Sequence, residues 1–459
     1  MCRIFSLLII FLCALSAHSE TVKTPESLEE VKLTFSPIVR KVAPAIVSIY
    51  ALQVVERKVH PLFDDDFFNN FFDHPQSPIR QELSKSMGSG VIVSKDGIIV
   101  TCAHVVQNAK VIEIKLSDNR LLKGKVTVLD EKNDLAIIQL LDIDGEIPFV
   151  PIGQSGLVEA GDLVLAFGNP FGIGHTVTNG IISATTRMVG DRVLMQTDSP
   201  INPGNSGGAL VNMKGELIGI PNAILSRTGT NLGIGFAIPV SVVVPLLSSK
   251  SQDGLIIRAW DGLRVETLSP EKAESFGLKN QKGVLVSALH ESSPAKKSGL
   301  QVSDVIVKID DTLIETEGAY RLKILETPID KDVAYTIKRK GEDKKLTFKL
   351  IAPPETPKAD ETIIKGRNPL SGLRIANLSP ALALKQGVDM MQTGVVVLES
   401  PSGRGLFGLS LCEPGDIIEE VDGEKVASVK QFAQLASDGL SSIILRRGNN
   451  KININIGVR

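Results

Sequence analysis

The chain contains the stretch Pro203-Gly204-Asn205-Ser206-Gly207-Gly208-Ala209-Leu210, a serine set among glycines and followed by apolar residues. Glycines let the backbone turn tightly and come close to a substrate. The backbone amides of such a turn can point at the oxyanion that forms when a serine attacks a carbonyl group. We therefore expect an oxyanion hole along Gly204, Asn205 and Ser206. A glycine-rich turn with an incidental serine gives the same pattern, so this stretch alone leaves both interpretations open.

Short apolar runs separated by turn residues surround this stretch from Met87 to Pro239. The run Val111-Ile112-Glu113-Ile114-Lys115-Leu116 partly alternates with a period of two residues, as half-buried strands do. Regularly spaced short strands favour an all-β barrel or sandwich. Before them, the segment from Ser27 to Val42 has acidic residues early and basic residues late, which predicts a helix.

A nucleophilic serine needs a base and a group that orients the base. His104 directly follows an apolar strand in Val100-Thr101-Cys102-Ala103-His104-Val105-Val106, a place where a histidine can also be purely structural. Asp134 lies just before another apolar run, where a carboxylate needs a partner such as an imidazole N–H. The chain order His104, Asp134, Ser206 is the chymotrypsin-type order. We expect these three residues to form a catalytic triad.

Composition limits the class of protein. The chain has 459 residues, which suggests about three domains, and its 50 Lys+Arg and 52 Asp+Glu give a formal net charge of -2. Near-neutral charge argues against a strongly basic nucleic-acid binder. Four cysteines are too few for a disulfide scaffold.

The first residues are typical of a secretory signal. Met1 to Ser19 has a basic Arg3, the apolar run Ile4 to Leu15, and small residues for cleavage. The run is much shorter than the roughly 20 residues of a membrane span, although an uncleaved anchor stays open as an alternative. Cleavage would leave Cys102 and Cys412, which are too far apart in the sequence for us to expect a disulfide.

The second half of the chain repeats itself. The stretch Asp261 to Pro270 matches Ser371 to Pro380, and Asp304-Val305-Ile306 matches Asp416-Ile417-Ile418. Units of this size are domains rather than solenoid repeats. The predicted organisation is a signal peptide at 1–19, a β domain at 20–250 with an inserted loop at 56–86, a first module at 251–352, a linker at 353–366 and a second module at 367–459.

The inserted loop carries five phenylalanines, Phe63, Phe67, Phe68, Phe71 and Phe72. Leaving so many aromatic rings in water is unfavourable, which favours a docking segment over a merely mobile loop.

These motifs resemble those of HtrA/DegP/DegQ-type (Do family) exported serine proteases, over nearly the whole chain from about Phe35. The resemblance rests on Gly88-Ser89-Gly90, on the motifs at His104, Asp134 and Ser206, on Gly168-Asn169-Pro170-Phe171-Gly172 and on Gly233 to Pro239. It implies a mainly β protein, with a chymotrypsin-like double β-barrel followed by two α+β PDZ domains. It also implies His104 as general base, Asp134 as its orienter and Ser206 as nucleophile, with no metal or cofactor required.

The resemblance places the base of the specificity pocket at Pro200, where no acidic side chain could pair with a basic substrate residue. We therefore predict cleavage after small or medium aliphatic residues. Arg187 matches the sensor-loop arginine of the family, but the segment after it is shorter than usual. The substrate-binding residues implied are Ile201, Asn202, Pro203, Leu232, Gly233, Ile234, Gly235 and Phe236.

In PDZ domains, backbone amides of one loop hold the carboxylate of a peptide that adds to a sheet edge. The matching residues are Gly262, Leu263, Arg264 and Val265 in the first module, and Gly372, Leu373, Arg374 and Ile375 in the second. Asp261 stands where the family has an aliphatic residue, and a fixed negative charge there would disfavour an incoming carboxylate, whereas Ser371 is neutral. A role in assembly or tethering is the alternative for either module.

The leading hypothesis is an endopeptidase that degrades misfolded exported proteins without ATP. The independence from ATP is expected because the chain lacks a P-loop motif. A holdase chaperone with minor proteolysis is the alternative, and the intact triad argues against an inert scaffold. The resemblance implies a homotrimer that can stack into larger cages. The signal segment predicts export to the bacterial periplasm, with peripheral membrane association left open, and the near-neutral charge predicts no nucleic-acid partner. For Cys102 we expect packing, with a redox switch as the alternative.

Overall fold

The computed structural model describes residues 34–58, 79–169, 174–201, 204–224, 233–248, 256–365, 370–400, 411–437, 440–448 and 450–455. The expected signal peptide, the five loop phenylalanines, and Asn202, Pro203 and Leu232 lie outside these ranges. Within these ranges, no helix combines the length and apolar composition needed to cross a membrane.

Antiparallel strands close a first barrel in the order β1-β2-β3-β6-β5-β4. Alternation decides which side chains enter it: in β4, Ile112 and Ile114 are buried whereas Val111 is exposed. Ile99 lies in the strand before His104, and Leu135 directly follows Asp134. Both side chains are fully buried, so they anchor the neighbouring turns to the barrel. The strands are β1 (Ile46–Lys58), β2 (Ile79–Ile92), β3 (Ile98–Thr101), β4 (Ala109–Lys115), β5 (Leu121–Asp130) and β6 (Leu135–Leu140).

A second barrel closes in the order β10-β11-β12-β9-β8-β7. The apolar core is continuous between the two barrels, because Phe167 and Ile220 belong to the same buried cluster as Ile99. The expectation of a mainly β protein with a double barrel is confirmed. The strands are β7 (Leu163–Gly168), β8 (Thr176–Val189), β9 (Arg192–Thr197), β10 (Ala209–Val211), β11 (Leu217–Ile224) and β12 (Gly235–Pro239).

Short helices connect or flank the barrels. The expected early helix is α1, which spans Ser36–Val42, and the part of the expectation before Thr34 lies outside the described residues. Basic Arg40 and Lys41 occupy its last turn, where they complement the helix dipole. The others are η2 (Ala43–Ala45), α3 (Ala103–Val106), η3 (Ser155–Leu157) and α4 (Val240–Ser248).

The two repeats fold into sheets of the same order, β13-β14-β15-β17-β18 in the first and β20-β21-β22-β24-β25 in the second, which has an additional strand, β19, on its edge. The first contains β13 (Leu263–Thr267), α5 (Pro270–Ser275), β14 (Val284–Leu289), α6 (Pro294–Lys297), β15 (Val305–Ile309), β16 (Thr312–Leu313), α7 (Glu317–Glu326), β17 (Asp332–Arg339) and β18 (Glu342–Lys349). The second contains β19 (Thr362–Ile363), β20 (Arg374–Asn377), α8 (Pro380–Gln386), β21 (Val395–Glu399), β22 (Ile417–Val421), β23 (Glu424–Lys425), α9 (Val429–Ser437), β24 (Ser442–Arg447) and β25 (Asn450–Asn455).

The matching sequence motifs of the repeats make the same contacts. Arg339 donates through Nε to the buried Asp304 at 2.6 Å, and Arg447 donates in the same way to the buried Asp416 at 2.8 Å. A buried carboxylate needs such a charged partner, so the repeated Asp and Arg follow from one structural requirement.

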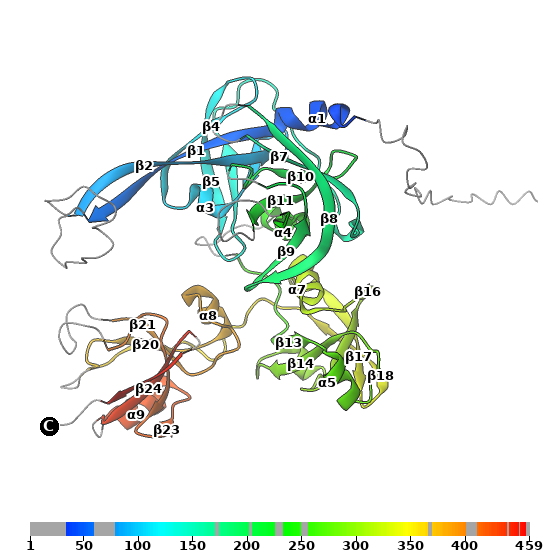
Figure 1. Cartoon of the computed structure of the whole chain (residues 1–459). Coiled ribbons are helices and arrows are strands. Elements are labelled where there is room, and N and C mark those ends of the chain that lie inside the picture. The colour runs from blue at the N-terminus through cyan, green and yellow to red at the C-terminus, as the bar shows by residue number, and fades with distance from the viewer. Residues whose placement is uncertain are drawn as a thin grey trace, which may run out of the picture.

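The first module contacts the second barrel through α7, which lies beneath β8 and β9 in Figure 1. Leu322 and Leu325 on this helix pack against the barrel core. Gly318 faces Thr186 of β8, and a Cβ atom added to this glycine would come within 3.3 Å of the Thr186 Cβ. Helix α7 therefore packs against the barrels as well as against its own module.

Candidate active site

Asp134 sits at the turn between β5 and β6. Its backbone φ of 56° is in the left-handed region, which aspartate tolerates better than most residues. The turn is fixed from within, because Asn133 donates through its side chain to Asp130 at 2.8 Å. The carboxylate of Asp134 is thereby aimed across the turn at α3.

His104 lies on α3 and meets Asp134 through two hydrogen bonds. Its Nδ1 lies 2.8 Å from Asp134 Oδ2, and its backbone amide donates to Oδ1 at 2.9 Å. Burial is the largest influence on the pKa of Asp134 and raises it, but the hydrogen bonds from His104 and Asn222 outweigh burial and hold that pKa below its usual value. The carboxylate therefore stays ionised and can fix the orientation of the imidazole ring.

Asn222 on β11 is a site residue that the sequence analysis missed. Its Nδ2 donates to Asp134 Oδ2 at 2.7 Å, and the residue is only 5% exposed. Its backbone carbonyl accepts the Ser206 hydroxyl at 3.2 Å. The available signal was an amide side chain within the otherwise apolar run Leu217–Ile224.

Ser206 lies in a turn that is tied to the first barrel. The amide of Ser89 donates to the Ser206 carbonyl at 3.2 Å, and the hydroxyl of Ser89 donates to the Gly204 carbonyl. Gly207 has a φ of 81°, and a Cβ there would lie 2.4 Å from the Ser89 carbonyl oxygen, so only glycine fits. Among the described residues the Ser206 hydroxyl bonds to the Asn222 carbonyl and not to His104.

Asn205, expected in the oxyanion hole, is buried next to Gly168. A Cβ on Gly168 would lie 2.4 Å from Asn205 Oδ1. The carbonyl of Asn205 accepts the Gly208 amide at 2.9 Å, which closes the turn after the serine. The Asn205 side chain thus packs behind the turn, while its backbone remains part of it.

Cys102 lies directly behind the triad. Its Sγ is 3.5 Å from the Asn222 Nδ2 and 3.5 Å from the Pro221 carbonyl oxygen. Burial, reinforced by the charge of Asp134, raises its pKa to about 12. The thiol is therefore protonated at neutral pH, which favours packing over a redox switch.

One group of described residues brings metal-ligand atoms close together: Cys102, His104 and Asp134 each offer an atom within 4.8 Å of the others. The protonated thiol and the His104–Asp134 hydrogen bond match a hydrogen-bonded His–Asp pair better than a metal centre. In the described residues, no disulfide involves Cys102 or Cys412.

The β8–β9 hairpin reaches the site. Val189 pairs with Arg192 across a tight turn, and Arg192 Nη1 lies 3.6 Å from Asp134 Oδ2. Arg187 donates through Nε to Gln196 on the neighbouring strand at 3.2 Å. The segment after Arg187 thus forms a closed hairpin, whose end adds a positive charge near the Asp134 carboxylate.

The predicted substrate-binding residues that are described lie around the start of β12. Gly235 faces Ile201, because a Cβ on this glycine would lie 2.8 Å from Ile201 Cδ1. Gly233 and Ile234 precede this strand, and Phe236 within it is buried. Ile201 itself is almost completely buried.

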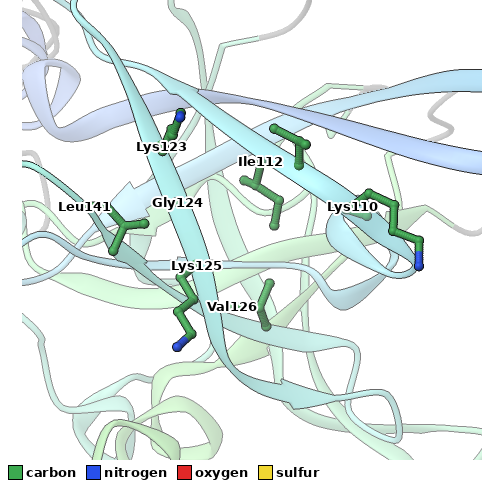
Figure 2. A pocket seen from close by; sticks show the side chains of 9 residues that line it. Lys110, Ile112, Lys123, Gly124, Lys125, Val126 and Leu141 are labelled. Carbon is green, nitrogen blue, oxygen red and sulfur yellow. The ribbon is translucent and has the colours of Figure 1, made fainter.

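A hollow of about 430 Å³ lies elsewhere, between β4 and β5 of the first barrel. Figure 2 shows its lining, which includes Lys110, Lys123 and Lys125. None of the predicted site residues lines it, so it does not belong to the candidate active site.

Asp261 in the first module takes an orientation that the sequence analysis did not foresee. Its Oδ2 accepts the hydroxyls of Tyr320 at 2.5 Å and Tyr335 at 2.7 Å, and its Oδ1 accepts the Leu263 amide at 3.2 Å. Burial raises the pKa of Asp261 despite these bonds. The carboxylate thus points into the module and does not present a fixed charge to an incoming peptide. It also accepts the hydrogen bond of the Leu263 amide, which is then not available to a ligand.

The other predicted PDZ residues lie at corresponding places. Gly262 precedes β13, which carries Leu263, Arg264 and Val265, and Gly372 and Leu373 precede β20, which carries Arg374 and Ile375.

Comparison with known proteins defines the class. A family model described as "Trypsin-like peptidase domain" matches residues 88–220, and one described as "PDZ domain" matches residues 262–350. The protein is therefore a trypsin-like serine peptidase with a following PDZ domain.

The relatives narrow this class. A probable periplasmic serine endoprotease DegP-like of a Marinomonas species is 34% identical over 88% of this chain and 88% of its own length. The protein of the same description from Rickettsia prowazekii is 32% identical over 94% of this chain and 90% of its own. The chain belongs to this family of DegP-like serine endoproteases.

Solved structures agree. The HtrA-type protease AlgW with a decapeptide is 37% identical, with a TM-score of 0.51, and the match covers 70% of this chain and 99% of that one. The same protease with a tripeptide is 34% identical, with a TM-score of 0.52, covering 70% of this chain and 98% of that one. The predicted serine endopeptidase activity and the resemblance to HtrA-type proteases are confirmed.

Proposed function

We propose that this serine endopeptidase degrades unfolded or misfolded proteins in the bacterial periplasm, without ATP, through Ser206, His104 and Asp134. The observation that supports this most is the pair of hydrogen bonds between His104 and the ionised Asp134, beside the serine turn. The curated relatives are described as periplasmic endoproteases, which favours proteolysis over a holdase role and supports export of this chain.

In the proposed mechanism, Ser206 Oγ attacks the peptide carbonyl carbon while His104 Nε2 takes the hydroxyl proton. Asp134 holds Nδ1–H and stabilises the imidazolium. The backbone along Gly204, Asn205 and Ser206 donates to the oxyanion. The proton then passes to the leaving amine, and water releases the acyl group by the same steps.

Ser206 must first leave its present partner. Its hydroxyl donates to the Asn222 carbonyl at 3.2 Å, so a rotation of the side chain is needed to present the proton to His104. Catalytic hydrogen bonds often tighten only when substrate binds. Substrate binding is therefore proposed to complete the triad.

Substrate capture is assigned to the PDZ modules. The AlgW structures are described as being with a decapeptide or a tripeptide, which supports peptide binding by such a protease. Capture beside the active site raises the local substrate concentration. Cleavage after small or medium aliphatic residues is supported by the contact of Ile201 with Gly235. A homotrimer is proposed as the assembly, to be measured by native mass spectrometry.

The test uses an unfolded protein substrate and three forms of the chain: the unchanged sequence, Ser206→Ala, and Ser117→Ala as a control. Ser117 is an exposed serine whose hydroxyl donates to the Pro44 carbonyl at 3.0 Å, away from the triad. Ser206→Ala should lose degradation at least a thousandfold, and Ser117→Ala should keep it. Undiminished degradation by Ser206→Ala would refute the site assignment.

A further inference from the structure

The two PDZ modules differ at the sheet edge that receives peptides. In the first module, β13 is the edge strand of the described sheet. In the second, the corresponding strand β20 is covered by β19, with Thr362 opposite Ile375 and Ile363 opposite Arg374 in an antiparallel register. Peptide ligands of PDZ domains add to a sheet edge as an extra strand. Because β19 comes from the segment between the modules, we propose that this segment is an internal ligand of the second module. The inference rests on the peptide-capture role proposed above.

Ile364, which directly follows β19, makes the backbone contacts expected of the C-terminal residue of a bound peptide. The Ile364 amide donates to the Leu373 carbonyl at 2.9 Å, and the Gly372 amide donates to the Ile364 carbonyl at 2.8 Å. Gly372 and Leu373 are the loop residues that sequence analysis assigned to carboxylate binding. The internal segment thus uses a loop amide that a bound peptide would need.

The side chains of this segment divide into one anchor and one exposed neighbour. Ile364 is 8% exposed and belongs to the apolar cluster that includes Leu373, Ile375 and Phe432. Ile363 is 54% exposed. An aliphatic last residue fits the position of Ile364, whereas the residue before it is free to vary.

Charge adds a second requirement. Arg374 on β20 binds Glu361 at 2.8 Å through Nη1, three residues before the anchor. Arg374 also pairs with Glu399 on the neighbouring strand, which holds the guanidinium at the sheet surface. The external ligand that fits is an extended peptide with a free aliphatic C-terminus and an acidic side chain three residues earlier. Its terminal carboxylate would accept the Gly372 amide as a charge-assisted bond.

Occupation by a tethered segment lowers the apparent affinity for outside peptides. A short tether gives an effective concentration in the millimolar range. The apparent dissociation constant equals the intrinsic one divided by the fraction of open grooves. Removing the anchor should therefore tighten peptide binding, whereas an equal change at the exposed neighbour should not.

Peptide binding to the full chain tests this, in a Ser206→Ala background that prevents cleavage. The probe is a labelled peptide that ends in Glu-Thr-Ile-Ile with a free carboxylate and carries a photo-crosslinker. Ile364→Ala should bind it at least tenfold more tightly than the Ser206→Ala parent. Ile363→Ala, the matched control, should stay within twofold. Cross-links in Ile364→Ala should map to β20 and α9.

A surface variant protects the test against loss of folding. Glu361→Lys leaves the apolar cluster intact and places a like charge beside Arg374, so it should bind the probe at least threefold more tightly. Equal affinity of both variants and the parent would overturn the proposal, as would cross-links confined to the first module. Failure of the proposed proteolysis would show separately, as undiminished degradation by Ser206→Ala, and would leave these affinities unchanged.

Discussion

Asn222 donates its side-chain amide to Asp134 at 2.7 Å, while its own backbone carbonyl holds the Ser206 hydroxyl at 3.2 Å. One residue of the second barrel therefore contacts both the carboxylate and the serine. Since Asp134 belongs to the first barrel, this contact also joins the two barrels at the site. We therefore expect Asn222 to act through these neighbours, as a positioning residue.

Asn222→Ala should lower kcat by about 10- to 100-fold with little change in KM, because a hydrogen bond to a charged group contributes about 1.5–3 kcal/mol. Asn450→Ala, an exposed asparagine in β25, is the control and should be unchanged. Steady-state kinetics with a cleavable peptide measures both. A loss confined to KM would contradict the positioning role.

The same substitution should alter acid stability. The lowered pKa of Asp134 means that its contribution to stability is complete above the unfolded-state pKa of about 3.9 and is lost as pH falls through the folded-state value. Without the Asn222 amide, the pKa of Asp134 should rise toward its ordinary value, and part of this contribution should disappear. Urea unfolding between about pH 3 and 7 measures it, and identical pH curves for both proteins would refute the expectation.

Cys102 should resist alkylation in the folded protein, because burial keeps its thiol protonated. Cys102→Ala should retain activity within about threefold and lose roughly 1 kcal/mol of stability. Mass spectrometry after treatment with iodoacetamide measures the modification. Rapid inactivation that Cys102→Ala prevents would instead show a reactive thiol and favour the redox switch.

Asp261 should make the first module less stable as pH rises. Its folded-state pKa is raised, so its contribution is complete below the unfolded-state value of about 3.9 and is lost as pH climbs through the folded-state value. Asp261→Asn keeps an acceptor for Tyr320 and Tyr335 and should remove this dependence. Hydrogen exchange of the β17 amides in the full chain, followed as a function of pH, measures the stability of the module. Asp311→Asn, an exposed control, should behave like the unchanged chain; if Asp261→Asn does so too, the interpretation fails.

Gly235→Ala should restrict the substrate residue that precedes the cleaved bond. The new methyl group would lie 2.8 Å from Ile201 Cδ1 and force this side chain to move. We expect kcat/KM to fall at least tenfold for a leucine at that substrate position and less for an alanine. Profiling with matched peptides measures the ratio, and an unchanged ratio would place the pocket elsewhere.

Sequence patterns predict His104, Asp134 and Ser206 as the triad because each lies in a short motif beside an apolar strand. The contact of His104 with Asp134 then follows from the antiparallel pairing of β3 with β6, in which Thr101 lies opposite Ala136. Asn222 was missed because it reaches Asp134 across 88 positions of sequence, from a strand in the other barrel. Local patterns carry no information about such a contact.

The two PDZ modules show the same limit. The repeat predicted two similar folds, but the orientation of Asp261 depends on Tyr320 and Tyr335, which only the folded sheet brings to it. The strand β19 covers two residues, too few for any periodicity to indicate it. The strand became evident only through its pairing with β20.

Covalent labelling of the serine tests the central claim most directly. A fluorophosphonate reacts with a serine that a neighbouring base activates, so mass spectrometry of the labelled full chain should find a single adduct, on Ser206. Labelling should be absent in Ser206→Ala and at least a hundredfold slower in His104→Ala. An adduct on another residue, or equal labelling rates with and without His104, would contradict the proposed triad.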